Sequence, residues 1–310
     1  MNAELQILPE LRSVKAHALP SNRWALGAMQ TFLRVVNRLH RRRFKHVMTR
    51  VLVRGSDEYN VPTVVIKPEK PQPPMPVLVY FHGGAFVMEG APSHFENAVR
   101  YAAEANCAVV FVEYRLAPQH VFPAGFNDCH AALLWTIANA PDLGVDATRV
   151  VVGGDSAGGN LAAGVVQRAL QEDAIALKGQ LLLYPAVDLL CARSSMRQFK
   201  SVPPFKDVSA TGIAAVYLGR APSRPLPQYS SPIDGTLAGL PPAYIETPQF
   251  DPLHDQGIDY AKALQDVGVQ VELNDIPGAI HGFDVVAPKS RVAHEAMRRR
   301  IAFLQKVFTP

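Results

Sequence analysis

The chain has 310 residues, of which 48% are hydrophobic and 19% are charged, as expected of a folded protein with one large α/β domain or two smaller ones. Its formal net charge of +4 is small, and the excess is concentrated between Arg34 and Arg50. A nucleic-acid-binding surface is usually larger and interleaved with aromatic residues, so no nucleic acid is expected as a partner. We interpret the basic segment as a solvated face, with contact to a lipid surface as the alternative.

The cysteines and the N-terminal segment indicate the compartment. Cys107, Cys129 and Cys191 are odd in number and far apart, so we expect buried free thiols in a reducing environment. The first twenty residues lack a basic start followed by an apolar core, and no signal peptide is expected. Polar residues interrupt the apolar stretch 24–36 well short of a membrane span. The sequence therefore predicts a cytoplasmic protein without stable membrane insertion.

The first quarter of the chain leads into a buried strand. Residues 1–46 carry apolar side chains at helical spacing before any strand signal, which predicts N-terminal cap helices outside the core. Extended patterns follow at 47–53 and 61–67. The proline-rich run 68–76 predicts a stiff loop that no central strand can contain. The continuous apolar run 76–81 is then typical of a strand buried on both faces.

Strands and helices alternate through the rest of the chain, so residues 47–310 are expected to form one α/β domain. The expected strands are 108–114, 150–152, 180–184, 243–247 and 269–274, and the expected helices are 92–104, 126–139, 157–172, 255–267 and 291–307. Residues 187–235 break this alternation, with one helical patch at 208–218. We expect this segment to be an insertion over the edge of the sheet. About eight strands with intervening helices predict a mostly parallel, doubly wound sheet.

A sharp turn joins the strand at Val150 to the next helix, with Ser156 at its apex. Gly154 and Gly158 flank the serine at two residues on either side, where side chains would collide with the strand and the helix. Such a turn exposes a hydroxyl group at the N-terminus of a helix, where negative charge is favoured. The alternatives are a phosphate-binding glycine-rich turn or a plain connecting loop.

Further reactive residues follow other strands, and their order along the chain is informative. Gly83 and Gly84 come directly after the strand 76–81, while an aspartate and a histidine follow two later strands. Because the carboxyl ends of parallel strands meet at one edge of the sheet, these residues are expected to lie together. The order Ser156, Asp251, His281 is that of α/β-hydrolases, in which histidine activates the serine and aspartate orients the histidine.

Five short motifs occur in order along the chain, and together they are more specific than any one of them alone. They are His82-Gly83-Gly84-Ala85, Tyr114-Arg115-Leu116-Ala117-Pro118, Gly154-Asp155-Ser156-Ala157-Gly158-Gly159-Asn160, Asp251-Pro252-Leu253-His254-Asp255 and His281-Gly282-Phe283. Together they resemble the hormone-sensitive-lipase-like branch of the α/β-hydrolases, which includes many bacterial carboxylesterases. The resemblance extends from about Met75 to the C-terminus. It implies an α/β-hydrolase fold with a helical cap built from residues 1–46 and 187–235, and a serine esterase that needs no cofactor.

The resemblance also implies an oxyanion hole and shows two departures from the family pattern. The matching donors are the N–H groups of Gly83, Gly84 and Ala157. Ala85 replaces the usual third glycine of the loop but removes no donor. Gln119 replaces the usual glutamate, keeping hydrogen-bonding capacity while losing a charge.

The histidine and the acid each have competitors. His281 is preferred among ten histidines because it follows a late strand in a loop bounded by proline and glycine. Asp255, Asp259 and Asp275 lie near Asp251, but Asp251 comes first in the loop after its strand. Asp255 and Asp259 are better interpreted as a helix cap and an exposed helix face.

Residues that line the substrate pocket are harder to select. Phe86, Phe205 and Phe283 are candidates for an acyl or alcohol pocket, and core packing is an equal alternative for each. No cluster of histidine and cysteine has the spacing of metal ligands, and no nucleotide-binding fingerprint is present. Neither a metal nor a cofactor is therefore expected.

The sequence thus predicts a carboxylesterase that hydrolyses short- to medium-chain acyl esters of small molecules through an acyl-enzyme. The first alternative is an amidase or deacetylase with the same Ser-His-Asp residues. The second is a non-catalytic small-molecule receptor on the same fold, against which the presence of His281 argues. A homodimer is an expectation from the resemblance alone.

Overall fold

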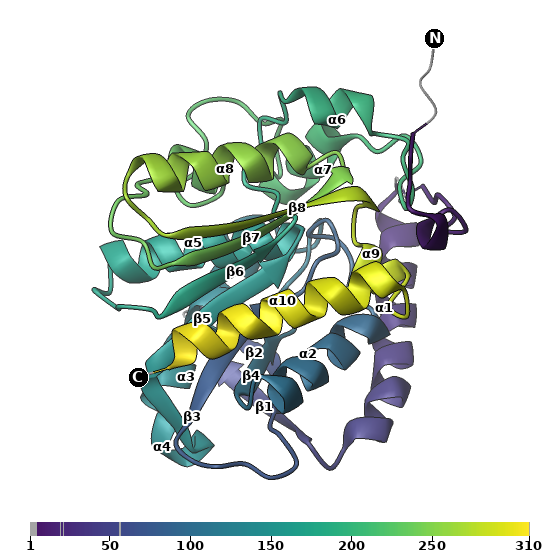
Figure 1. The fold of residues 1–310 in the computed structure, drawn as a ribbon. Coiled ribbons are helices and arrows are strands. Elements are labelled where there is room, and N and C mark those ends of the chain that lie inside the picture. Colours follow the sequence, from purple (N-terminus) through teal and green to yellow (C-terminus); the bar gives the residue numbers. More distant parts are fainter. Residues whose placement is uncertain (1–4, 19, 21, 56, 310) are drawn as a thin grey trace.

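The computed structural model describes residues 5–18, 20, 22–55 and 57–309, and its strands form one eight-stranded sheet in the order β1-β2-β4-β3-β5-β6-β7-β8 (Figure 1). β2 is antiparallel to β1 and β4, and the pairs from β4 to β8 are parallel. The strands are β1 Met48–Arg54, β2 Asn60–Ile66, β3 Met75–Phe81, β4 Ala108–Val112, β5 Val145–Asp155, β6 Gly179–Leu183, β7 Ala243–Phe250 and β8 Val271–Ile280. The predicted mostly parallel sheet is confirmed.

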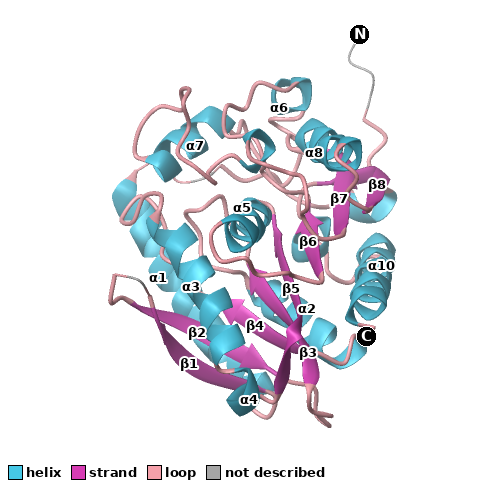
Figure 2. Cartoon of the chain, turned by 90° about the vertical axis from the view of Figure 1, so that its left-hand side faces the viewer, coloured by secondary structure: helices cyan, strands magenta, loops and turns pink. Residues whose placement is uncertain are grey.

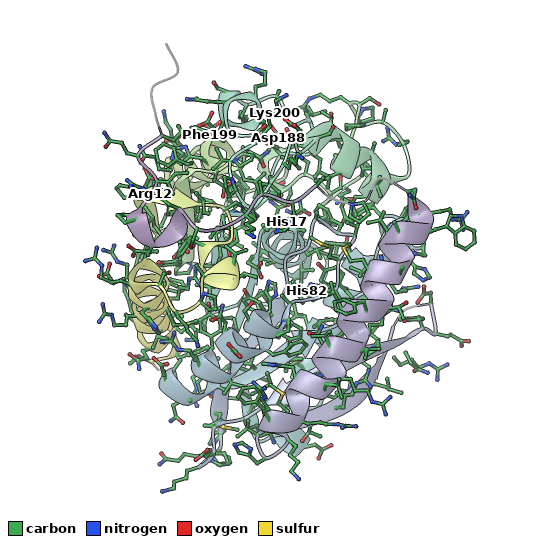
Figure 3. All side chains as sticks on the ribbon, turned by 90° about the vertical axis from the view of Figure 1, so that its right-hand side faces the viewer. Arg12, His17, His82, Asp188, Phe199 and Lys200 are labelled. Carbon is green, nitrogen blue, oxygen red and sulfur yellow. The ribbon has the colours of Figure 1, made fainter. Side chains whose placement is uncertain are left out.

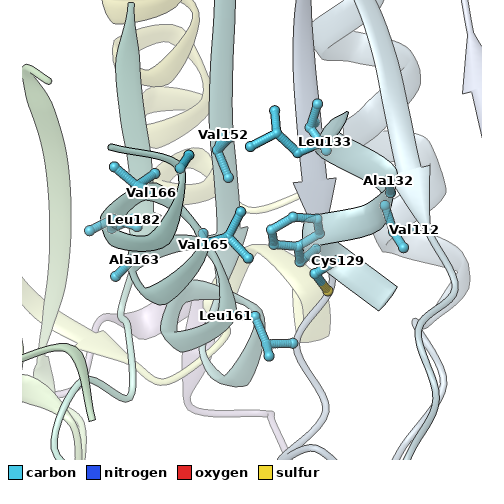
Figure 4. Close-up of a cluster of buried hydrophobic side chains, with 14 of the residues drawn as sticks. Val112, Cys129, Ala132, Leu133, Val152, Leu161, Ala163, Val165, Val166 and Leu182 are labelled. Carbon is cyan, nitrogen blue, oxygen red and sulfur yellow. The ribbon is translucent and has the colours of Figure 1, made fainter. Parts of the chain in front are cut away.

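Helices cover both faces of the sheet, as the apolar strands β3 and β4, buried on both sides, require (Figure 2). The helices are α1 Arg23–His40, α2 Pro92–Glu104, α3 Ala124–Ala138, α4 Ala140–Leu143, α5 Ala157–Gln171, α6 Ser194–Gln198, α7 Ala210–Leu218, α8 His254–Asp266, α9 Phe283–Val286 and α10 Arg291–Phe308, with short 3₁₀ turns η1 Pro9–Leu11, η2 Arg41–Phe44 and η3 Pro232–Asp234. The side chains of β3 alternate between two cores, one formed with α3, α5 and α8, the other with α2 and α10. Figure 4 shows part of the first core, where Cys129 and Leu133 face Leu161 and Val165.

The N-terminal segment differs from the predicted helix over residues 1–46. Only η1, α1 and η2 are helical there, and residues 1–4, 19 and 21 lie outside the described part. Between residues 5 and 18 the described chain is irregular apart from η1 and the turn after it: the Leu8 amide donates to the Gly278 carbonyl, and Leu11 is buried. Contacts with the end of β8 therefore override the helical spacing of these apolar residues.

Several strand boundaries also differ from the sequence prediction, and one of them bears on the site. β5 begins at Val145, earlier than expected, and β8 runs on to Ile280. β8 continues through Pro277 while pairing with β7, with a register shift near its end. As a result His281 follows the sheet edge directly, opposite the end of β7.

The described helices include none that is both long and apolar enough to cross a membrane. The three cysteine sulfurs are free, as predicted, but only Cys107 and Cys129 are fully buried. Cys191 is half-buried and lies in the wall of a cavity at the carboxyl edge of the sheet. The expectation of burial was therefore wrong for this residue.

Candidate active site

The turn between β5 and α5 holds Ser156 in a conformation that few residues adopt, with φ 54° and ψ −116°. A Cβ atom on Gly154 would lie 2.4 Å from the Gly158 carbonyl oxygen, and one on Gly158 would lie 2.0 Å from the Phe81 carbonyl oxygen. Both glycines are thus required by close backbone contacts, as predicted. The turn is fixed further because the Ser156 amide donates to the Leu183 carbonyl (2.8 Å).

The three residues predicted to act together are brought into one hydrogen-bonded chain. Asp251 follows β7, His281 follows β8, and the Nδ1–H group of His281 donates to Asp251 Oδ2 at 2.7 Å. The Nε2 atom of His281 lies 3.0 Å from Ser156 Oγ. Asp251 is fully buried, and its other oxygen accepts the Leu253 amide at 2.7 Å. This second bond fixes the carboxylate, which in turn fixes the imidazole tautomer.

The competing acids are engaged elsewhere. The imidazole of His254 lies 3.2 Å from both Asp255 and Asp275, away from the Ser156 hydroxyl. Asp259 forms an ion pair with Arg193 at 2.7 Å. The sequence-based preference for Asp251 therefore agrees with the geometry, and Asp259 lies on an exposed helix face, as expected.

The loop after β3 lies beside Ser156, but one of the three predicted oxyanion donors is not free. The N–H group of Gly83 donates to Asp155 Oδ1 at 2.9 Å, so it is already occupied. The amides of Gly84 and Ala85 have no acceptor among the described residues, and neither does that of Ala157, the first residue of α5. The free donors at this edge are therefore Gly84, Ala85 and Ala157, in place of the predicted set with Gly83. Sequence spacing gives no sign of the bond that occupies Gly83.

His82 supports this loop from below and takes no part in proton transfer. Its ring is fully buried and stacks on Tyr114, with the ring centroids 4.5 Å apart. Burial lowers the pKa of His82 to about 4, so the imidazole is neutral at physiological pH. Its Nδ1–H group donates to the Gly83 carbonyl at 2.7 Å. These contacts give His82 a structural role in holding the loop.

A buried ion pair between His94 and Asp155 lies beneath the loop. Asp155 accepts hydrogen bonds from Tyr80 (2.9 Å) and His94 (3.1 Å) in addition to Gly83. Burial opposes ionisation of Asp155, but the nearby His94 and the hydrogen bonds outweigh it, and the pKa of Asp155 is lowered. Burial equally disfavours charge on His94, yet the Asp155 carboxylate raises the pKa of that imidazole. Nothing near His94 in the chain reveals this partner, which lies 61 residues away.

Replacing Asp155 by asparagine is expected to lower the free energy of unfolding by about 3 kcal/mol, because His94 would lose its buried counter-charge. Urea denaturation at neutral pH measures the change. Asp142→Asn, at an exposed position in α4, provides the matched control and is expected to leave the midpoint unchanged. Equal midpoints for the two variants would contradict a stabilising role for the pair.

An apolar cavity of about 470 Å³ opens beside Ser156 and His281. Phe205 and Phe86 both lie in its wall, and the Phe205 ring centroid is 4.9 Å from that of His281. Phe283 does not reach the cavity: it is fully buried, and its ring packs against Tyr184 and Arg300. Assigning Phe283 to the pocket was therefore wrong, since the first turn of α9 directs it into the core.

The cavity also has walls that the sequence did not select. α1 contributes Met29, Phe32 and Leu33, and His17 reaches the cavity from the segment that precedes α1. Figure 3 views this face, with α1 along the surface and His17 and His82 labelled. His17 is held in place because its amide donates to the Pro204 carbonyl at 2.8 Å. Among the described residues, no group of three or more histidine, cysteine or acidic side chains is arranged to hold a metal ion.

Comparison with known proteins gives one consistent result. Residues 78–285 match a family model described as alpha/beta hydrolase fold. Carboxylesterase NlhH of Mycobacterium tuberculosis is 38% identical over 250 residues, covering 80% of this chain and 78% of the relative. Ethyl acetate hydrolase of Pseudomonas putida is 34% identical over 230 residues, covering 73% and 72%. The crystal structure of esterase LipW from Mycobacterium marinum superposes with a TM-score of 0.89 at 30% identity, covering 98% and 97% of the two chains.

The chain belongs to the α/β-hydrolase family, since the family model spans about two thirds of it and the fold agrees over nearly its full length. Within that family it is a carboxylic ester hydrolase of the hormone-sensitive-lipase-like branch, as its motifs predicted.

Proposed function

We propose that the protein hydrolyses carboxylic esters through an acyl-enzyme formed on Ser156. The observation that carries this proposal is the chain of two hydrogen bonds, 3.0 and 2.7 Å long, that links Ser156 through His281 to Asp251. A serine hydroxyl is a weak nucleophile unless a base removes its proton during attack, and Nε2 of His281 faces that hydroxyl. The buried Asp251 carboxylate stabilises the imidazolium that results.

The backbone supplies the second part of the proposed mechanism. As Ser156 attacks, negative charge develops on the ester carbonyl oxygen. The free amides of Gly84, Ala85 and Ala157 would stabilise this charge by donating hydrogen bonds to the oxygen. The N-terminus of α5 favours the same charge. His281 then protonates the leaving alcohol and afterwards activates the water that releases the acid.

The cavity supports a preference for short and medium acyl chains. Its volume of about 470 Å³ is that of a site for a small molecule, and apolar side chains from α1 and from residues 187–235 line it. The apolar lining would bury the hydrocarbon part of a short or medium acyl chain. The buried free thiols of Cys107 and Cys129 support a cytoplasmic location.

A panel of p-nitrophenyl esters tests the activity and the chain-length preference together. We expect kcat/KM to be highest for butyrate and hexanoate and to fall steeply towards palmitate. Matched p-nitroanilides provide the comparison for the amidase alternative and are expected to react far more slowly. Faster turnover of the anilides would favour that alternative, and failure to turn over any ester would contradict the proposal.

A further inference from the structure

The apolar cavity beside Ser156 is called the acyl cavity below. A second cleft, of about 590 Å³, lies on the other side of α1 from it. α1, η2, β1 and the loop after β4 form its walls. Guanidinium groups dominate its charge, and they belong to Arg34, Arg38, Arg41, Arg50 and Arg115. Two acidic side chains, Glu89 and Glu113, line the same cleft. The proposed hydrolytic mechanism uses none of these residues.

Three of the five arginines already have close carboxylate partners. The ion pairs are Arg34–Glu89 (2.6 Å), Arg41–Glu113 (2.7 Å) and Arg115 with Asp57 (2.6 Å) and Asp128 (2.7 Å). Arg38 has no such partner among the described residues. Arg50 reaches only the carboxylate that Arg41 already binds, at 3.5 Å. Arg38 and Arg50 are therefore the two guanidinium groups of the cleft that have no carboxylate partner of their own in the described part of the chain.

The periodicity of α1 explains why this cleft and the acyl cavity share a wall. Thr31, Arg34 and Arg38 recur at three- and four-residue intervals and so lie on one face of the helix, towards the cleft. Met29 and Leu33 lie on the opposite face and line the acyl cavity. α1 thus separates the two cavities, with one face of the helix lining each of them.

Hydrogen bonds join α1 to residues 87–90, which lie between β3 and α2. Gln30 Nε2 donates to the Val87 carbonyl at 2.8 Å, and Asn37 Nδ2 donates to the Gly90 carbonyl at 2.6 Å. Both side chains are almost completely buried. The position of α1, and with it the position of Arg38, is therefore fixed relative to the body of the protein before any ligand arrives.

We propose that this cleft binds a phosphate dianion, either free or as the head group of a small phosphomonoester, between Arg38 and Arg50. Guanidinium groups present paired N–H donors that match phosphate oxygens, and Arg38 and Arg50 have no carboxylate of their own, among the residues that the structure describes, to occupy these donors. The cleft is larger than a bare ion needs, and its far wall carries Tyr59, whose ring lies over the Arg115 guanidinium at 4.4 Å. That wall leaves room for the organic part of a phosphomonoester.

Isothermal titration at low ionic strength, in a chloride buffer, tests the proposal with inorganic phosphate and glycerol 3-phosphate as separate ligands. Loss of one charge-assisted contact weakens binding by roughly tenfold, so Arg38→Gln and Arg50→Gln are each expected to raise Kd by that factor. Tighter binding of glycerol 3-phosphate would assign the site to phosphomonoesters, and equal or weaker binding would assign it to free phosphate.

Arg42→Gln is the matched control, because Arg42 is an exposed residue of the same basic segment that does not line the cleft. It removes the same charge and is expected to leave Kd unchanged. An equal loss of affinity in this control, unchanged affinity in the Arg38 and Arg50 variants, or no binding of either ligand to the wild type would overturn the proposal. Circular dichroism and thermal unfolding without ligand confirm that each variant is folded.

Discussion

Ser156→Ala is expected to lower kcat for p-nitrophenyl butyrate by roughly 10⁶-fold, the size of the effect of removing the nucleophile from a serine hydrolase. The substitution removes one oxygen atom from a turn whose backbone bond to Leu183 and whose glycine contacts remain in place. Stability should therefore change little while acylation stops. The residual rate would come from binding and from the oxyanion donors alone.

Two measurements make the result specific. A fluorophosphonate probe is expected to label the wild type at one serine, identified by mass spectrometry of the labelled peptide, and to leave the Ser156→Ala variant unlabelled. Ser201→Ala, at an exposed position in the 187–235 segment, is the matched control and is expected to retain full labelling and turnover. Undiminished turnover without the Ser156 hydroxyl would end the acyl-enzyme proposal.

Asp251→Asn is expected to lower kcat by about 10⁴-fold while the protein remains folded. Asparagine keeps the size of the side chain, but its amide N–H₂ can face Nδ1 of His281 and favour the tautomer with the proton on Nε2. That tautomer cannot accept a proton from Ser156. The rate of p-nitrophenyl butyrate hydrolysis near neutral pH measures the loss.

The neighbouring acids provide controls for this assignment. Asp255→Asn and Asp275→Asn remove carboxylates that contact His254, and each is expected to leave kcat close to that of the wild type. A large loss in either variant, together with an active Asp251→Asn variant, would move the role of orienting acid to that other residue.

The fold and the reacting side chains were predictable because they depend on local patterns. Continuous apolar runs identify the buried strands, and residues directly after those strands must meet at one edge of a parallel sheet. Ser156, Asp251 and His281 each satisfy this rule. The glycine contacts at the turn follow from its sharpness, which is also a local property.

Features that depend on contacts between distant segments were not predictable. The bond from Gly83 to Asp155 joins residues 72 positions apart and occupies a donor that the motif predicts to be free. The partnership of His94 with Asp155 spans 61 positions. Phe283 comes two residues after His281 in sequence, but its side chain is buried in the core, whereas the neighbouring Gly282 lines the cavity. No pattern within a single segment contains this information.

The reacting residues and the walls of the acyl cavity come from different parts of the fold, and this has an evolutionary consequence. The residues proposed to carry out the reaction are anchored to strand ends, where added atoms at the glycines would collide with backbone. The walls that meet the acyl group come instead from α1 and from the 187–235 segment. Substrate preference is therefore free to drift under mutation while the reaction is conserved. Libraries restricted to Met29, Phe32 and Phe205 would sample new substrates at little risk to folding.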